Sequence, residues 1–367
     1  MLSEKANKTV KACRFCWMCR HLCPIGLKTG RENNTPRAKG ILLDMAGNGE
    51  AYSVSMAEDM YECLLCGACA AGCETGFDPR IFIREARTKA VVEDVVPDYV
   101  QAVIDNLTET GNLWGIPSEK KAEALSPWSK DKAEVILYAG ETAALKTPQM
   151  VETAAKLLAA AGVDFATLRD EPSSGAMLGD LIGYVDDTAA CAKILAEAIA
   201  SAGAKTVVVL DPADANVMKQ EYPQWGIELG ADVVTATAYF AELAAQGRLN
   251  PAKVTVADAT YHDPDRLARD LDETQPARDL LAAMGIAWKE MFFNRDMVRS
   301  CGEQAVKAHS PKIVALTAAG RWEDVDRCGR KTVITASPSD YEILSADIPK
   351  GHAVEDLFAL LAKACGL

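Results

Sequence analysis

The sequence lacks long hydrophobic runs, an excess of basic residues and glycine-rich phosphate loops. No stretch approaches the roughly 18 uninterrupted apolar residues of a membrane-spanning helix, and the lysine-containing start has no apolar signal core. We therefore expect a cytoplasmic protein without a membrane span. With 39 Lys and Arg against 52 Asp and Glu, the net charge of -13 argues against a general nucleic-acid binder. No dinucleotide or P-loop glycine pattern is present, so we expect no flavin bound by this chain.

What the sequence does have is the composition of a folded protein and an unusual number of cysteines. Its 367 residues are 49% hydrophobic and 25% charged, which fits two or three ordinary domains. Of the 12 cysteines, eight fall in two runs that share the spacing C-x2-C-x2-C-x3-C. The first run is Cys13, Cys16, Cys19 and Cys23, and the second is Cys63, Cys66, Cys69 and Cys73.

This spacing predicts iron–sulfur clusters. Thiols in a reducing compartment bind metals rather than form disulfides, and three cysteines two residues apart can wrap one corner of a cubane. Zinc is the alternative, but it usually takes cysteine pairs separated by a longer finger or ribbon. In two-cluster ferredoxins the fourth cysteine of each run binds the other cluster. We therefore expect two 4Fe-4S clusters with crossed ligands: cluster 1 on Cys13, Cys16, Cys19 and Cys73, and cluster 2 on Cys63, Cys66, Cys69 and Cys23.

The 39 residues between Cys23 and Cys63 are too many for the compact bacterial ferredoxin fold and have helical signals. Thr35 before Pro36 predicts a helix start, and Ser55 with Glu58 resembles a capping box ahead of the second run. Asp78-Pro79 predicts the start of a long helix to about Asn106. Residues 1–107 are thus expected to form an α-helical ferredoxin domain.

Charge is unevenly distributed along the chain. Residues 1–40 hold nine basic residues and two acidic ones, a local net charge of +7. This pattern fits either a docking face for an acidic redox partner or cations that compensate the thiolates of a cluster.

A different pattern follows a linker at residues 108–132. Short β-branched runs alternate with alanine-rich helical stretches, which predicts α/β structure with parallel sheets. The run from Val207 to Asp214 recurs from Val333 to Asp340, and similar small-residue turns precede both. We therefore expect a duplicated, pseudo-twofold Rossmann-like domain, with halves at 133–250 and 251–367.

Together, the eight cysteines, the duplicated region and stretches such as Tyr261–Asp265 and Ser300–Gly302 resemble the CCG-domain family of iron–sulfur proteins. This family includes the B-type and D-type subunits of heterodisulfide reductase and the iron–sulfur subunits of glycolate oxidase and glycerol-3-phosphate dehydrogenase. The resemblance implies a complex with an FAD-dependent dehydrogenase subunit, with an electron-transfer flavoprotein as a further candidate partner.

The chain departs from this family where each half usually offers five cysteines, which hold noncubane clusters in heterodisulfide reductase. One cysteine remains at those positions, which are here Glu141, Ser173, Ser174, Asp211, Asp214, Asp265, Ser300, Cys301, Ser337 and Asp340. Serine and aspartate are hard oxygen donors that suit iron–sulfur clusters poorly. We expect no noncubane cluster and no heterodisulfide chemistry.

Two interpretations of these residues remain. Glu141, Asp211, Asp214, Asp265, Asp340, His262 and Cys301 could converge on a new metal or acid/base site. Alternatively, Asp211-Pro212 and Ser337-Pro338 are helix N-caps, His262-Asp263-Pro264 is a turn at a strand end, and Cys301 is a buried packing residue. We favour the second interpretation.

The sequence therefore predicts an iron–sulfur electron-transfer subunit of a multi-subunit flavin-dependent oxidoreductase, which itself binds no substrate. The alternative is a heterodisulfide-reductase-like enzyme with a modified metal or thiol site around Cys301 and His262. A third hypothesis is a structural adaptor whose clusters only hold the helical domain together.

Overall fold

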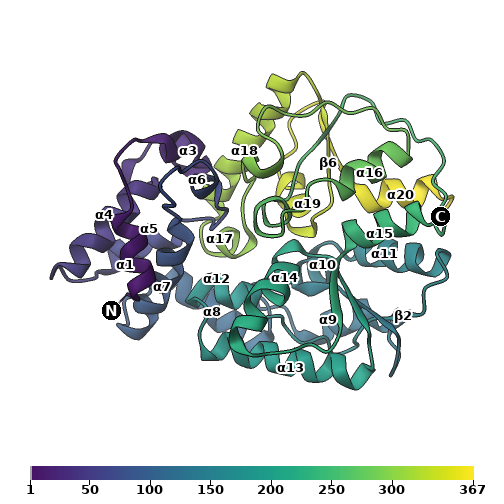
Figure 1. The fold of residues 1–367 in the computed structure, drawn as a ribbon, viewed down its shortest axis with the longest axis horizontal. Coiled ribbons are helices and arrows are strands. Elements are labelled where there is room, and N and C mark those ends of the chain that lie inside the picture. Colours follow the sequence, from purple (N-terminus) through teal and green to yellow (C-terminus); the bar gives the residue numbers. More distant parts are fainter. Residues whose placement is uncertain (1) are drawn as a thin grey trace.

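The computed structural model describes residues 2–367 and combines a helical part with two parallel β-sheets (Figure 1). The helical part comes first in the chain. Its helices are α1 (Glu4–Lys11), α2 (Met18–Leu22), α3 (Pro24–Thr29), η1 (Glu32–Asn34), α4 (Pro36–Gly47), α5 (Val54–Tyr61), α6 (Ala68–Ala71), α7 (Pro79–Val92), α8 (Asp98–Thr110), α9 (Ser118–Leu125) and η2 (Ser126–Trp128). No helix within residues 2–367 has the length and apolar character needed to cross a membrane.

The helix starts follow local capping chemistry. Thr35 caps α4 by accepting a hydrogen bond from the Ala38 N–H at 3.3 Å, as predicted. The predicted capping box at Ser55 is wrong, because Ser53 caps α5 instead and accepts from the Met56 N–H. The long helix expected to reach Asn106 is also wrong. It is two helices, and the break between them ends at Pro97, which disfavours helical backbone in the residue before it.

The first sheet has four parallel strands in the order β2-β1-β3-β4. Its strands are β1 (Val135–Tyr138), β2 (Phe165–Ala166), β3 (Thr206–Val209) and β4 (Asp232–Thr235). The connecting helical elements are α10 (Gly140–Lys146), α11 (Pro148–Ala160), α12 (Ala176–Ile182), α13 (Asp186–Ala202), α14 (Pro212–Asn216), η3 (Val217–Glu221), η4 (Tyr222–Trp225) and α15 (Ala236–Ala245). Helical crossovers of this kind are what parallel strands require.

The second sheet has three parallel strands in the order β5-β6-β7. Its strands are β5 (Ala259–Tyr261), β6 (Thr332–Thr335) and β7 (Ala353–Asp356). The helical elements around it are η5 (Arg266–Asp270), α16 (Pro276–Ala283), η6 (Arg295–Met297), α17 (Gln304–His309), α18 (Pro311–Cys328), α19 (Pro338–Ser345) and α20 (Leu357–Ala364). The prediction of parallel α/β structure after a helical domain is confirmed.

One hydrophobic core joins the two sheets. Helices α11, α15, α16 and α20 lie together between them (Figure 1), and their apolar faces share one buried cluster. At its centre the rings of Phe240 on α15 and Phe358 on α20 meet edge to face with centroids 5.3 Å apart. The sheets are therefore fixed relative to each other by apolar burial.

The helical part packs on the same unit through α12, α17 and α18, which contact α7, α8 and α3. Arg87 of α7 is buried at this junction. Its guanidinium donates to the backbone oxygens of Met60, Tyr61, Cys63 and Asp180. One side chain therefore ties the end of α5, the start of the second cysteine run and α12 together.

We predict that Arg87→Met destabilises the protein by about 3 kcal/mol or more, because several buried carbonyl groups would lose their donor. The urea midpoint of the iron-loaded protein measures this effect. Lys89→Met on the same helix is the control, because its ion pair with Glu93 lies near the surface and should contribute less than about 1 kcal/mol. Equal losses in the two variants would contradict a special role for Arg87.

The sheet end also contains a buried acid, Asp356, which caps α20. It accepts a hydrogen bond from the Phe358 N–H at 2.9 Å, while its second oxygen has no partner. Burial raises the pKa of Asp356 to about 7, although the N–H groups of Phe358 and Ala359 oppose this shift.

Asp356→Asn keeps a capping oxygen but cannot ionise, so we predict a pH-dependent gain in stability. In the unfolded chain the aspartate ionises at about pH 4, whereas in the folded protein it stays protonated up to about pH 7. The wild type therefore loses stability as the pH rises from about 4 to about 7. The melting temperature of the variant relative to wild type should increase between about pH 5.5 and about pH 8. Parallel curves for the two proteins would contradict this account.

Candidate functional site

The two cysteine runs fold into matching loops. Phe15 and Trp17 in the first run have φ values of 57° and 70°, and Leu65 and Gly67 in the second have 53° and 75°. Left-handed backbone is costly for residues other than glycine, so its repetition at equivalent positions indicates a functional constraint. The Phe15 and Leu65 N–H groups each donate to the preceding Cys13 or Cys63 thiol at 3.4 Å. The loops thus turn backbone N–H groups toward sulfur.

The thiols gather in two sets of four, and each set draws one cysteine from the other run. Burial raises the pKa of Cys19, and the nearby Cys13, Cys16 and Cys73 raise it further. Burial likewise raises the pKa of Cys69, together with Cys66, Cys63 and Cys23. The set of Cys13, Cys16, Cys19 and Cys73 is called the outer set below, and the set of Cys23, Cys63, Cys66 and Cys69 is called the inner set.

The inner set fits an iron–sulfur cluster by its donor chemistry. All four cysteines line one cavity, whose other walls include Pro24, Pro36 and Ile83. Burial raises the pKa of Cys23 to about 11 and that of Cys66 to about 12, so these thiols keep their protons until a metal displaces them. Four soft sulfur donors around one cavity suit iron–sulfur ligation.

Buried cations surround the inner set. Lys39 is 1% exposed, and Cys63 and Cys23 partly oppose the fall in its pKa that burial causes. Arg269 donates from Nε to the Cys66 carbonyl oxygen at 2.5 Å, and Arg87 donates to the Cys63 carbonyl oxygen at 2.6 Å. These cations offset the negative charge that thiolates would bring into the interior.

Sequence reasoning included Lys39 among the basic residues that could compensate a cluster, but missed Arg87 and Arg269. Each is a single Lys or Arg in a helix or turn, and local spacing does not separate it from an exposed basic residue. The signal available was the unusual density of Lys and Arg near the first run, which includes Lys39.

Around the first sheet, Glu141, Ser174, Asp211 and Asp214 form a buried polar cluster. Ser174 donates to Asp214, while Asp211 caps α14 through the Ala213 N–H and accepts from Ser339 at 2.6 Å. Both carboxylate oxygens of Glu141 are buried without a hydrogen-bond partner. Burial, followed by Glu141 and Asp211, raises the pKa of Asp214 well above its usual range.

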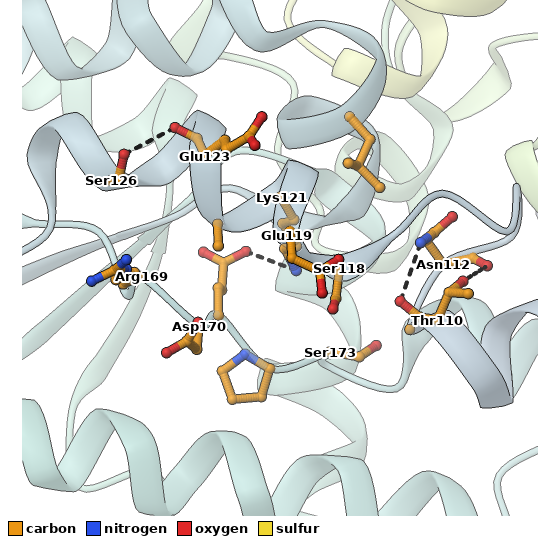
Figure 2. Close-up of a pocket in the computed structure, with 15 residues that line it drawn as sticks. Thr110, Asn112, Ser118, Glu119, Lys121, Glu123, Ser126, Arg169, Asp170 and Ser173 are labelled. Carbon is orange, nitrogen blue, oxygen red and sulfur yellow. Dashed lines mark hydrogen bonds and ion pairs between the residues drawn. The ribbon is translucent and has the colours of Figure 1, made fainter.

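Ser173 lies beside this cluster, at the rim of a separate cavity of about 680 Å³. Figure 2 shows Lys121 pointing toward a carboxylate of the loop that follows β2, and the two ends of this ion pair, Lys121 and Glu171, lie 3.2 Å apart. The labelled wall also carries Glu119, Arg169 and other polar groups. Its lining residues include no cysteine, so this cavity lies outside the thiol chemistry.

In the second half, His262, Cys301 and Asp340 meet, and their potential ligand atoms lie within 4.8 Å of one another. The Cys301 thiol donates to Asp340 at 3.2 Å, and Arg321 donates from Nε to His262 Nδ1 at 2.9 Å. Because Nδ1 accepts this bond, the proton of a neutral His262 ring is on Nε2, which faces Asp340 at 3.6 Å. A ligating histidine would instead present a lone pair there and donate from its other nitrogen.

These bonds favour a buried hydrogen-bonded group over a metal site. The Cys301 thiol is fully buried, and burial and Asp340 raise its pKa well above the usual value, so it is a poor nucleophile. Ser337 caps α19 through the Asp340 N–H, as predicted. Asp265 pairs with Arg269 at 3.6 Å, and the Ser300 hydroxyl donates to the Gly302 carbonyl oxygen.

Comparison with known proteins agrees with this assignment of the thiols. A family model described as a 4Fe-4S dicluster domain matches residues 9–77. The D-type subunit of the dihydromethanophenazine:CoB--CoM heterodisulfide reductase of Methanosarcina acetivorans is 27% identical over 390 residues, covering 97% of this chain and 94% of that protein.

Two longer proteins also align. The EtfAB:quinone oxidoreductase of Syntrophomonas wolfei is 27% identical over 272 residues, covering 69% of this chain and 36% of that protein. The probable iron-sulfur-binding oxidoreductase FadF of Bacillus subtilis is 25% identical over 264 residues, covering 67% of this chain and 37% of that protein. A solved structure of a hypothetical protein from Helicobacter pylori aligns with a TM-score of 0.45 and 12% identity over 76% of this chain and 58% of that one.

The predicted resemblance is confirmed at the level of these relationships. Homology to the D-type heterodisulfide reductase protein runs along nearly the whole chain, and the dicluster match falls on the paired cysteine runs. The chain is therefore an iron–sulfur protein homologous to the D-type protein of heterodisulfide reductase and to iron–sulfur oxidoreductases, which is consistent with the CCG-type iron–sulfur family.

Proposed function

We propose that this chain is the electron-transfer subunit of a multi-subunit flavin-dependent oxidoreductase. It would relay electrons through two 4Fe-4S clusters between an FAD-dependent dehydrogenase subunit and a further acceptor, and would bind no flavin itself. The observation that carries this proposal is the pair of four-thiol sets, one near the surface and one inside. The relative named EtfAB:quinone oxidoreductase favours an electron-transfer flavoprotein as a partner.

The outer set would hold cluster 1 and the inner set cluster 2. Such clusters supply one-electron storage at low potential when bound. The chain's own residues would set the environment of that charge. Lys39, Arg87 and Arg269 would stabilise an added electron at the inner set, because they are buried cations close to its cysteines.

The rest of the chain would be a duplicated scaffold. We assign residues 1–107 to the ferredoxin domain, 108–132 to a linker, and 133–250 and 251–367 to the two halves. The matching strand orders β1-β3-β4 and β5-β6-β7 support duplication. So do the equivalent proline-started helices α14 and α19, which follow the central strand of each sheet.

The former cysteine positions of this scaffold would hold no iron–sulfur cluster. Nine of the ten carry oxygen donors, and several of these are already engaged as helix caps or in hydrogen bonds. The second candidate function is a reductase acting at Cys301 and His262, which the close approach of His262, Cys301 and Asp340 favours. The hydrogen bond from Arg321 to His262 and the inert Cys301 thiol favour the relay instead.

Crossed ligation predicts which spectra change together. Cys73→Ser should alter the same EPR signal of the dithionite-reduced protein as Cys16→Ser, because both would belong to cluster 1. Cys23→Ser should alter the same EPR signal as Cys66→Ser, because both residues would bind cluster 2. Serine oxygen is a weaker ligand for iron than cysteine sulfur. Each substitution should therefore shift or remove the EPR signal of one cluster and leave the signal of the other cluster unchanged.

The control for this experiment is Cys365→Ser, a cysteine at the end of α20 that lies in neither set. It should leave both signals unchanged. If Cys73→Ser altered the signal that Cys66→Ser alters, the ligands would not be crossed as proposed.

The reductase alternative makes the opposite prediction at Cys301. In the electron relay, Cys301→Ala should leave the iron content, both EPR signals and electron transfer to an added viologen dye unchanged, because this thiol belongs to neither ligand set. Turnover of the purified complex by its flavoprotein should also persist. Loss of turnover with both signals intact would favour a catalytic thiol.

A further inference from the structure

The two cysteine loops differ sharply in what covers them. In the first run Phe15, Trp17 and Met18 are 58%, 40% and 53% exposed, and the Cys16 ligand between them is exposed as well. In the second run the equivalents of Phe15 and Met18 are Leu65 and Ala68, which are only 1% and 4% exposed.

The second loop is covered by η5 and η6 of the α/β region and by Arg80 of α7. Arg269 binds the Cys66 carbonyl oxygen, and Arg80 lies so close to Gly67 that a Cβ there would meet its guanidinium at 2.8 Å. The first run has a tryptophan, Trp17, at the position of this glycine, on left-handed backbone that glycine would adopt more easily. Packing of the protein interior does not explain this aromatic residue, because the Trp17 side chain is partly exposed to solvent.

Basic residues lie beside the exposed aromatic residues, and Arg31 follows Gly30, which lines the same surface hollow as Trp17 and Arg20. The Arg37 guanidinium stacks on the Trp17 ring at 3.7 Å, and Arg20 lies 5.8 Å from the same ring. Arg20 and Arg31 reach acidic neighbours only at 3.7 Å, and their side chains are 47% and 55% exposed. Arg14 is exposed too.

This exposure separates the two interpretations of the basic N-terminus. Cations that compensate a cluster are most effective when buried, as Lys39 is. Exposed arginines are screened by water and contribute little to a cluster, but they steer an approaching anionic partner. An apolar aromatic centre with a rim of arginine is also the usual anatomy of a protein interface.

We propose that Phe15, Trp17 and Met18, with the arginine rim of Arg14, Arg20, Arg31 and Arg37, form the docking site of an acidic electron-carrier protein. Electrons would therefore enter or leave the chain through the outer set. This inference rests on the proposed electron-transfer function and names the kind of partner. The face contains Cys16, an exposed member of the outer set, and an exposed cluster ligand that a redox protein can approach closely favours an electron carrier over a membrane as the occupant.

The test uses flavodoxin, an acidic flavoprotein, as the probe. Dithionite-reduced, iron-loaded protein is mixed with oxidised flavodoxin in a stopped-flow instrument, and each transfer moves one electron from this chain to the probe's flavin. Arg20→Glu/Arg31→Glu should lower the rate constant about tenfold or more at low salt, and the difference from wild type should shrink at high salt.

The matched control carries the same charge change elsewhere. Lys193→Glu/Lys219→Glu reverses two exposed lysines on α13 and η3 and should leave the rate near that of wild type. Trp17→Gly copies the second loop without straining the backbone and should slow transfer at both low and high salt, because it removes the apolar centre. The EPR signals of every variant confirm that its clusters are intact.

Unchanged rates in the Arg20→Glu/Arg31→Glu and Trp17→Gly variants would overturn the docking site. A second result would also overturn it. If the wild type but not these variants cosedimented with phosphatidylserine-containing vesicles, and the rate of electron transfer to flavodoxin were the same in all of them, the face would be a membrane contact. Failure of dithionite to reduce the wild type would instead contradict the proposed function itself, so the two failures are distinguishable.

Discussion

Four cysteine thiols that line one cavity in a protein interior are unstable as free thiolates, because they repel one another and have lost water. In the inner set, backbone N–H groups donate to the Cys23 and Cys63 sulfurs, and buried cations lie close to the thiols. The surrounding structure follows from this instability. Arg87 and Arg269 reach the loop from α7 and from η5 in the α/β region, so the same contacts that support the thiols also join the two parts of the molecule.

In the α/β region, the positions where the resemblance would place cysteines have structural roles. Asp211 and Ser337 now cap helices, Cys301 donates to Asp340, and Ser174 donates to Asp214. These roles stabilise the polypeptide and engage several of the oxygen atoms that a metal would need. Both carboxylate oxygens of Glu141 and one oxygen each of Asp214 and Asp340 are buried without a hydrogen-bond partner, and the structure offers no physical account of them.

Much of the molecule could be predicted from its sequence where the signal is local. The repeated cysteine spacing pointed to the thiol sets, and Thr35-Pro36, Asp211-Pro212 and Ser337-Pro338 marked real helix starts. Helix ends were less accurate. Ser53 and Ser55 are both serines ahead of the same helix, and the structure uses the first as the cap.

Features that depend on tertiary contacts could not be predicted. The burial of Arg87, the approach of Arg80 to Gly67, and the hydrogen bond from Arg321 to His262 join residues far apart in the chain. The contrast between the two loops has the same origin. Trp17 and Gly67 occupy equivalent places in one motif, and only the fold reveals that one faces solvent and the other faces Arg80.

The central claim is that the chain stores electrons at two thiolate-bound clusters and nowhere else. The most direct measurement is iron and acid-labile sulfide per anaerobically purified chain, combined with a coulometric reductive titration. The account predicts about eight irons, about eight sulfides and the uptake of about two electrons per chain. Clearly more iron or electrons would mean that the α/β region holds a further redox centre, and about four irons would mean that one thiol set is empty.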